Sequence, residues 1–362
     1  MPLSLDEMLK MMVEQDGADL FLSVGAQPTI RGGKGIYTID DHLLNDDNTL
    51  DFATEIMSES QRQAFYNTNE MNMAFEKKDS GRFRASIFRQ KGHVGLVLRQ
   101  VKLIVPSVDE LGLPQILKDL ISVPRGLVLI TGATGSGKST TLAAMIDHRN
   151  ATMGGHVMTL EDPIEFVHGH KKSVVNQREV GLDTEDYRTG LKNVLRQAPD
   201  VILIGEIRDA ETMENAMMYA ETGHLVLSTL HSLNANQTLD RITQFFPLDM
   251  KPNVQFQLAN ILRAVVSQRL VPKKDGTGRV AILEIMITTA RVRELIAKGD
   301  IGELKTVMEA GGQDGMQTFD SHLHRLYNEG VLDREDALRA ADSKGDLNLR
   351  MQGLTTGTTS IA

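Results

Sequence analysis

The pattern of apolar and polar positions changes near residue 105, and this change predicts two domains. Before that point, an amphipathic helix from Ser4 to about Gln15 is followed by short runs in which apolar and polar residues alternate. Such alternation is typical of half-buried β-strands. One further helix is predicted near residues 48–60. Residues 1–104 are therefore expected to form an α+β domain with an antiparallel sheet.

After residue 105, short apolar runs alternate with long helical patterns. This arrangement is typical of a mostly parallel sheet that helices cover on both faces. The predicted strands are GLVLI (126–130), HVMTLED (156–162), VILIGE (201–206) and HLVLSTL (224–230). The second domain is therefore expected to be of the α/β class.

Prolines and composition set the expected boundaries. Pro106, Pro114 and Pro124 interrupt the stretch between the two patterns, which favours a linker there. The last residues are small and polar, which favours disorder or the remnant of a tag. The predicted segments are 1–104 (first domain), 105–123 (interdomain linker), 124–289 (α/β core), 290–345 (C-terminal helical region) and 346–362 (disordered tail).

The most specific local signal is GATGSGKST at residues 132–140, which matches G-x-x-x-x-G-K-[ST] between a predicted strand and a predicted helix. In this phosphate loop, the glycines let backbone N–H groups surround nucleotide phosphates, Lys138 neutralises the β and γ oxygens, and the Ser139 hydroxyl ligates Mg²⁺. ATP and Mg²⁺ are the expected cofactors. The predicted nucleotide-binding residues are Gly132, Thr134, Gly135, Ser136, Gly137, Lys138, Ser139 and Thr140.

Hydrolysis also needs carboxylates for the metal and for the attacking water. Glu206 directly follows one apolar strand, as a metal-associated acid would, and Glu161, Asp162 and Glu165 follow another. Taken singly, each of these acids is equally well explained as a helix cap or a surface charge.

Two histidines and two arginines are further candidates. His224 and His231 flank an apolar strand, and their odd spacing of seven makes them poor joint metal ligands. One of them is a candidate sensor of the γ-phosphate, and a satisfied histidine at a strand end is the alternative. Arg84 and Arg99 lie in predicted strands of the first domain. They are either solubilising charges or arginine fingers that reach a nucleotide in a neighbouring subunit.

Composition narrows the function classes. The 362 residues carry a formal net charge of −9 and only 4% aromatic residues, so a polyphosphate backbone is not an expected partner. Zero cysteines exclude disulfides and thiolate-metal sites. The N-terminal residues lack the pattern of a signal peptide, and no apolar stretch approaches the ~20 residues that span a bilayer. A cytoplasmic protein without membrane insertion is expected.

With these motifs in hand, the chain resembles the PilT/PilU group of type IV pilus retraction ATPases, in the secretion ATPase superfamily. GATGSGKST is similar to the family's Walker A motif, TLEDPIEF to its Asp box, APDVILIGEIRDAETM to its Walker B motif, and TGHLVLSTLH to its His box. The segments SLNANQTLDRITQFFP and GMQTFDSHLHRLYNEG resemble the PilU form more than the PilT form. Zero cysteines and a start directly in the first domain argue against the extension and type II secretion ATPases.

The resemblance implies a RecA-like P-loop ATPase core preceded by a PAS-like domain, in a homohexamer. It makes Glu165 the catalytic glutamate, Glu206 the Walker B acid that assists Mg²⁺ together with Ser139, and Arg84, Arg99, His224 and His231 further catalytic residues. Nucleotide-driven rotation of one domain against the other would then power or assist pilus retraction and twitching motility. The implied location is peripheral, at the cytoplasmic face of the bacterial inner membrane.

The implied partners are a PilT-type retraction ATPase and a platform protein of the inner membrane. Where PilT-type chains carry AIRNLIRE, this chain has ARVRELIA at residues 290–297. This departure keeps open an accessory ATP-binding ring that depends on a partner ATPase. A nucleic-acid translocase is the other alternative, which the acidic balance and the few aromatic residues disfavour.

Overall fold

The computed structural model describes residues 3–33, 35–101 and 104–354, and in it the chain divides into two compact units. One unit comprises residues 1–104 together with 165–167, and the other comprises residues 105–164 and 168–362. Each unit has a hydrophobic core of its own.

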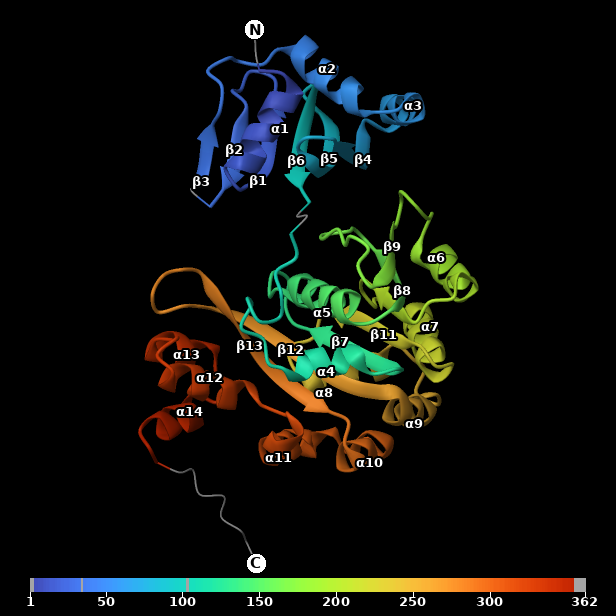
Figure 1. The fold of residues 1–362 in the computed structure, drawn as a ribbon, viewed down its shortest axis with the longest axis vertical. Coiled ribbons are helices and arrows are strands. Elements are labelled where there is room, and N and C mark those ends of the chain that lie inside the picture. Colours follow the sequence, from blue (N-terminus) through green and yellow to red (C-terminus); the bar gives the residue numbers. More distant parts are fainter. Residues whose placement is uncertain (1–2, 34, 102–103, 355–362) are drawn as a thin grey trace, which may run out of the picture. The chain divides into compact units, whose positions relative to one another are not determined.

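The first unit is built on a six-stranded antiparallel sheet in the order β3-β2-β1-β6-β5-β4 (Figure 1), which confirms the sheet predicted from the alternating pattern. Its apolar face packs against helices α1 to α3. The elements are α1 (Leu5–Glu14), β1 (Gly17–Ser23), β2 (Thr29–Gly32), β3 (Gly35–Thr38), α2 (Asp46–Ile56), α3 (Glu59–Thr68), β4 (Glu70–Lys77), β5 (Gly81–Gln90) and β6 (His93–Gln100).

The single helix predicted near residues 48–60 is wrong, because two helices occupy this region. Met57 has an extended backbone, with φ −90° and ψ 136°, and this ends α2. The Ser58 side chain then accepts a hydrogen bond from the Gln61 N–H, and the Gln61 side chain bonds back to the Ser58 backbone. Such a reciprocal capping box starts a new helix, and it outweighs the continuous helical periodicity.

The second unit contains a seven-stranded sheet in the order β13-β12-β7-β11-β10-β8-β9. All neighbouring strands are parallel except the pair β12 and β13. The mostly parallel sheet is therefore confirmed. Its strands are β7 (Gly126–Thr131), β8 (Gly155–Glu161), β9 (Ser173–Glu179), β10 (Val201–Ile204), β11 (Leu225–Leu230), β12 (Leu262–Pro272) and β13 (Arg279–Ile287).

Helices cover both faces of this sheet. Leu127 and Leu129 of β7 point into a core with α6 to α11, whereas Val128 and Ile130 point into a core with α4 and α5. The fully buried central strand thus carries apolar residues on both sides. The helices are α4 (Ile116–Ser122), α5 (Lys138–Thr152), α6 (Tyr187–Val194), α7 (Ala210–Glu221), α8 (Ala235–Gln244), α9 (Lys251–Ile261), α10 (Ala290–Lys298), α11 (Leu304–Ala310), α12 (Phe319–Asn328), α13 (Arg334–Ala340) and α14 (Lys344–Met351).

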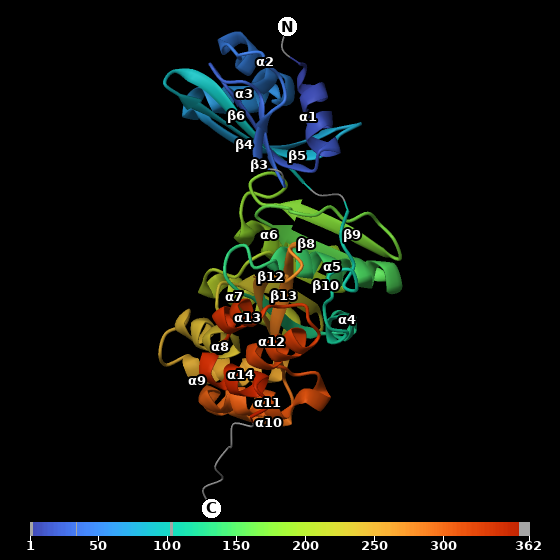
Figure 2. The ribbon, with the colours of Figure 1, turned by 90° about the vertical axis from the view of Figure 1, so that its left-hand side faces the viewer.

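Helices α12 to α14 pack against the β12–β13 pair (Figure 2). Val271 and Ile282 are buried there together with apolar residues of these helices. Arg269 of β12 fixes the connection between α13 and α14. Its guanidinium donates to the Ala340 carbonyl and to the Asp342 carboxylate, each over 2.6 Å, and stacks on the Phe319 ring. These contacts join the C-terminal helices to the sheet through one strand.

Two predicted segments need correction. The expected linker 105–123 is packed into the second unit, because Val108, Leu113 and the buried face of α4 are part of its core. The disordered tail predicted from residue 346 is wrong for its first residues, because α14 continues to Met351 with Leu347 buried. Residues 355–362 lie outside the described part of the chain.

The buried His322 of α12 leads to a prediction for stability at low pH. Its Nδ1 accepts a hydrogen bond from the Leu283 N–H, and burial lowers its pKa from 6.5 to about 4. The unfolded chain binds this proton more readily than the folded chain. The free energy of unfolding therefore decreases as the pH is lowered below 6.5, by about 2 kcal/mol at pH 5. His322→Asn keeps an acceptor for Leu283 but does not titrate, so its urea midpoint is expected to depend less on pH.

The half-buried His324 of the same helix gives the matched control, and His324→Asn should leave the pH dependence of the urea midpoint unchanged. Burial also lowers the pKa of His168 to about 4, so part of the dependence will remain in His322→Asn. An identical slope in wild type and His322→Asn between pH 7 and 5 would contradict the prediction.

Candidate functional site

The phosphate loop, residues 132–140, connects β7 to α5 and includes the first three residues of α5, as the sequence predicts. Helix α5 begins at Lys138, and its N-cap, Gly137, provides no side-chain hydrogen bond to the first turn. The Lys138 ammonium folds over the loop and donates to the carbonyl oxygens of Gly132 and Ala133, over 2.9 and 3.0 Å. A helix N-terminus without a side-chain cap, beside a buried ammonium, is a site for an anion.

Two features of the loop fit a phosphate group closely. The buried Ser136 hydroxyl has no hydrogen-bond partner among the described residues, so a phosphate oxygen would satisfy it. Gly132 and Gly137 have positive φ values of 146° and 88°. A Cβ atom on Gly132 would lie 2.5 Å from the Ser136 hydroxyl, and one on Gly137 would lie 2.8 Å from the Gln268 amide nitrogen. The loop can therefore close over a phosphate only with glycine at these positions.

A cavity of about 290 Å³ opens beside the loop within the second unit. Leu111, Leu113 and Leu270 provide apolar walls, and Arg279 provides a charged group. Because the cavity also contacts Gly137, Thr140 and Thr141, a molecule with its phosphates in the loop could place an apolar ring there. Its lining residues are Leu111, Leu113, Gly137, Thr140, Thr141, Gln268, Leu270, Arg279 and Ala281.

Parallel strands bring Glu206 and His231 together at the same edge of the sheet. Glu206 follows β10, His231 follows β11, and the neighbouring strand β7 leads into the phosphate loop. The His231 Nε2 lies 3.1 Å from one carboxylate oxygen of Glu206, and Arg208 Nε donates to the other over 2.8 Å. The hydrogen bond to Glu206 raises the pKa of Arg208, so the carboxylate is held between two nitrogen groups beside the loop.

The acids after β8 have different surroundings. Glu161 accepts hydrogen bonds from the Thr159 hydroxyl over 2.6 Å and from the Gln177 amide over 3.2 Å. Asp162 lies 3.6 Å from Arg208, which joins it to the Glu206 group. Glu165 is exposed, and the division of the chain into compact units assigns it, with residues 166 and 167, to the first unit.

The two predicted histidines lie at opposite ends of one strand. His224 precedes β11, where its Nδ1 contacts the Tyr219 carbonyl and the Thr222 hydroxyl, over 3.1 and 3.3 Å. His231 follows β11. Both histidines lie just outside β11, so the whole length of the strand separates them. Only His231 lies at the edge of the sheet that carries the phosphate loop.

In the first unit, Arg84 of β5 and Arg99 of β6 are directly opposite each other in the register of the two strands. The alternation in β5 places Phe83, Ala85 and Ile87 in the core, as predicted, with Arg84 on the other face. Arg99 Nε donates to the buried carboxylate of Asp19 over 2.7 Å. This bond raises the pKa of Arg99 and fixes the direction of its side chain.

Sequence reasoning missed the residues that hold the candidate site residues in place. Asp19 orients Arg99, Arg208 orients Glu206, and Gln268 of β12 accepts a hydrogen bond from the Thr141 hydroxyl over 2.8 Å next to the phosphate loop. Arg208 could have been found from its position two residues after Glu206. The other two lie far from their partners in sequence, and no local pattern marks them.

Two oxygen-bearing side chains near the phosphate loop could bind a metal ion together with a nucleotide. The Ser139 hydroxyl lies in the first turn of α5, and the Glu206 carboxylate lies on the neighbouring strand end. Among the described residues, no cluster of three or more His, Cys, Asp and Glu could hold a metal alone. These two groups suit Mg²⁺, which usually keeps several waters and completes its shell with phosphate oxygens.

The chain is similar in sequence to known proteins. Residues 68–338 match the model of the family described as type II/IV secretion system protein. The chain is 46% identical to the type IV pilus ATPase PilU of Pseudomonas aeruginosa, over 97% of this chain and 92% of that protein. It is 43% identical to the type IV pilus retraction ATPase PilT of the same organism, over 94% and 98% of the two chains.

A solved structure extends the comparison to the fold. The pilus retraction motor PilT with bound ADP superposes with a TM-score of 0.88 at 41% identity, over 94% of this chain and 98% of that one. The ATPase DotB of Legionella pneumophila superposes with a TM-score of 0.75 at 26% identity, over 92% and 94%. Within the described ranges, this chain has no helix that is both long and apolar enough to cross a membrane.

Proposed function

We propose a function on the following premise: the chain belongs to the type II/IV secretion system protein family and, within it, to the PilT/PilU group of type IV pilus ATPases. It is an ATP-hydrolysing motor that powers or assists pilus retraction. The observation that supports this most is the phosphate loop at the end of β7 with Glu206 and His231 on neighbouring strand ends. In this proposal, the second unit is the RecA-like core and the first unit is the PAS-like domain.

In this proposal the loop N–H groups, Lys138 and the Ser136 hydroxyl bind the phosphates, and the adjacent cavity receives the base. Ser139 and Glu206 would hold Mg²⁺, which would supply positive charge to neutralise the phosphates. Glu165 orients and deprotonates the attacking water. His231 contacts Glu206 and is thus placed to respond to the γ-phosphate, whereas the position of His224 supports a structural role.

Arg84 and Arg99 are proposed to reach the nucleotide of a neighbouring subunit in a homohexameric ring. Their pairing in register across β5 and β6 places two arginines opposite each other, and Asp19 limits the freedom of Arg99. Loss of the γ-phosphate would then change how the units are held and reorient one against the other. The ring is proposed to work at the cytoplasmic face of the inner membrane, on a platform protein and beside a PilT-type ATPase.

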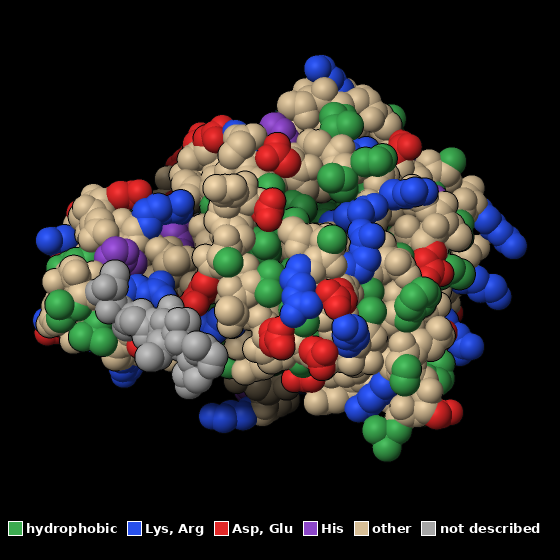
Figure 3. Space-filling view, turned by 90° about the horizontal axis from the view of Figure 1, so that it is seen from below, with side chains coloured by type: hydrophobic (Ala, Val, Ile, Leu, Met, Phe, Trp, Pro, Cys, Tyr) green, Lys and Arg blue, Asp and Glu red, His purple; other side chains and the backbone are tan. Residues whose placement is uncertain are grey.

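Charge gives no support to the nucleic-acid alternative. Acidic residues exceed basic ones by nine in the sequence. On the face that Figure 3 shows, Lys and Arg side chains are interspersed with Asp and Glu. A phosphate backbone is better matched by a continuous basic surface.

The role of Glu165 gives the test of this function. Glu165→Gln keeps the size and polarity of the side chain but removes the base, so kcat is expected to fall about a hundredfold or more. Affinity for ATP, measured by fluorescence of a labelled nucleotide, should stay within about twofold of the wild type, because Glu165 is not proposed to hold the phosphates.

The exposed Glu185 provides the control, and Glu185→Gln should hydrolyse ATP at the wild-type rate. Full turnover in Glu165→Gln would exclude Glu165 as the base. If wild type itself forms rings that bind ATP without turnover, the accessory role would replace the motor.

A further inference from the structure

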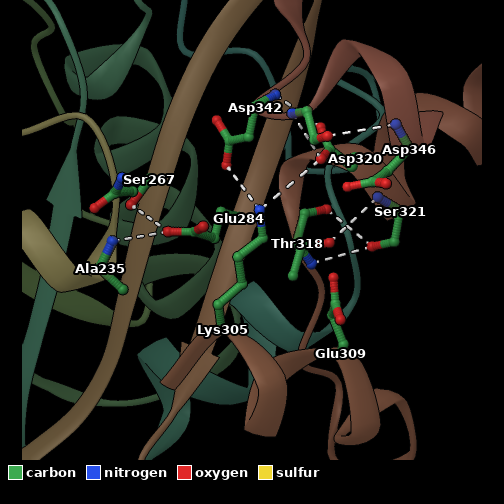
Figure 4. A network of polar contacts seen from close by, with 12 residues as sticks. Ala235, Ser267, Glu284, Lys305, Glu309, Thr318, Asp320, Ser321, Asp342 and Asp346 are labelled. Carbon is green, nitrogen blue, oxygen red and sulfur yellow. Dashed lines mark hydrogen bonds and ion pairs between the residues drawn. The ribbon is translucent and has the colours of Figure 1, made fainter. Parts of the chain in front are cut away.

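A buried carboxylate outside the candidate site occupies the middle of the second unit. Glu284 of β13 is only 2% exposed, and its neighbours along the strand, Leu283 and Ile285, are buried apolar residues. Its Oε1 accepts hydrogen bonds from the Ala235 N–H over 2.7 Å and from the Ser267 hydroxyl over 3.3 Å (Figure 4). A buried carboxylate is costly, so its presence among apolar residues calls for an explanation.

The hydrogen bonds continue from Glu284 to the strand that carries the phosphate loop. The Thr131 hydroxyl donates to the Ser267 hydroxyl oxygen over 3.0 Å. Ser267 pairs in register with Thr131 on one side and with Glu284 on the other, so the three side chains are cross-strand neighbours on β7, β12 and β13. Thr131 is the last residue of β7 and directly precedes Gly132.

At its other end the chain of hydrogen bonds reaches the segment that carries His231. Ala235 is the first residue of α8, four residues after His231. The segment between them is held locally, because the Asn234 side chain caps α8 and Ser232 bonds to Thr238 over 2.7 Å. These bonds fix the segment to α8 alone. The bond from Ala235 to Glu284 instead fixes the start of α8 to the sheet.

Several neighbouring groups affect the pKa of the Glu284 carboxyl group. Burial raises its pKa to about 7, and the Asp342 carboxylate acts in the same direction. The Ala235 N–H at the N-terminus of α8, the Ser267 hydroxyl and the Arg269 guanidinium act in the opposite direction. A carboxylate with these donors binds the helix N-terminus more strongly than a neutral acceptor does.

We infer that Glu284 is a positioning residue, which ties the start of α8 and the His231 segment to the strand end that carries the phosphate loop. Its contribution is to turnover, through the placement of His231 against Glu206, and not to ATP affinity, which the loop itself provides. This inference rests on the proposed role of His231.

The test compares kcat and KM for ATP in Glu284→Ala and Glu284→Gln. The alanine variant removes the acceptor, so kcat should fall about tenfold while KM stays within about twofold. The glutamine variant keeps an acceptor oxygen for both donors and should recover kcat to within about threefold of the wild type. His322→Asn, a change in a buried polar residue that contacts the same strand, is the control and should leave kcat unchanged.

Ser267→Ala provides a milder second variant should Glu284→Ala not fold. It interrupts the bonds between Glu284 and Thr131, and should lower kcat about threefold to fivefold at constant KM. Wild-type kcat in folded Glu284→Ala or in Ser267→Ala would overturn the inference, as would a rise in KM that accounts for the whole loss. The variant His231→Ala distinguishes a failure of the proposed role of His231 from a failure of the inferred role of Glu284. Wild-type turnover in His231→Ala would refute the role of His231. Loss of turnover in His231→Ala together with wild-type turnover in Glu284→Ala would refute only the role of Glu284.

Discussion

Lys138→Ala is expected to abolish measurable ATP turnover, with a loss of about a thousandfold or more. The ammonium is almost fully buried in the phosphate loop, where it donates to two loop carbonyls and provides the positive charge next to the predicted phosphate positions. Its removal leaves the phosphates facing the loop N–H groups and the Ser136 hydroxyl without the lysine's positive charge, and losing one such stabilising group costs about 10²–10³ in rate. Weaker nucleotide binding adds to this loss. Phosphate release and the binding of a fluorescent nucleotide measure the two effects.

Two further substitutions make this prediction specific. Lys192→Ala removes an exposed lysine from α6 and should leave turnover unchanged. Lys138→Arg keeps the charge, but its planar guanidinium is larger than the ammonium in a loop where even a Cβ at Gly132 or Gly137 would collide. It is therefore expected to stay inactive. Retained turnover in Lys138→Ala would refute the assignment of the loop.

Arg84→Ala is expected to lower kcat by about a thousandfold if it acts as an arginine finger. Arg84 lies on the polar face of β5, opposite Arg99, and its loss should remove a charge from the transition state without affecting the fold of the apolar face. ATP affinity in the subunit that holds the nucleotide should change much less. Steady-state turnover and equilibrium nucleotide binding measure the two quantities.

Mixing two inactive variants tests whether Arg84 acts on a neighbouring subunit. Arg84→Ala subunits keep an intact phosphate loop, and Lys138→Ala subunits keep Arg84. In a ring assembled from equal amounts of the two variants, about a quarter of the interfaces bring an intact loop and an intact Arg84 together. Partial recovery of turnover is therefore expected. Arg89→Ala, on the same strand, is the control and should be active alone. No recovery on mixing, with rings confirmed by light scattering, would contradict action across the interface.

The sequence predicts the parts of the structure that depend on local pattern. The strand GLVLI, the loop with three glycines and the helix after it were all predicted, because each is specified by neighbouring residues. The antiparallel sheet of the first unit was predicted for the same reason. The strand register that pairs Arg84 with Arg99 was not predicted, because register depends on contacts between strands.

Other elements follow from long-range contacts that a local pattern does not reveal. Strand β12 continues directly from α9, so no turn residue marks its start, and the prediction missed it together with β9 and β13. Glu284 is a charged residue in an apolar run, and only the fold shows that Ala235 and Ser267 satisfy it. The proline-rich segment 105–123 has the composition of a linker, yet its apolar residues are buried by β7 and α5.

The attachment of α12 to α14 bears on how shortened forms of the chain would behave. Arg269 holds the turn after α13, and Asp320 of α12 accepts hydrogen bonds from the N–H groups of Asp342 and Ser343, over 2.8 and 3.1 Å. A fragment that stopped at residue 289 would expose the apolar side of β12 and β13, including Val271 and Ile282, at the edge of the sheet. Such an edge promotes association between chains. By covering Val271 and Ile282, the C-terminal helices are therefore expected to keep chains from associating through this side of the sheet.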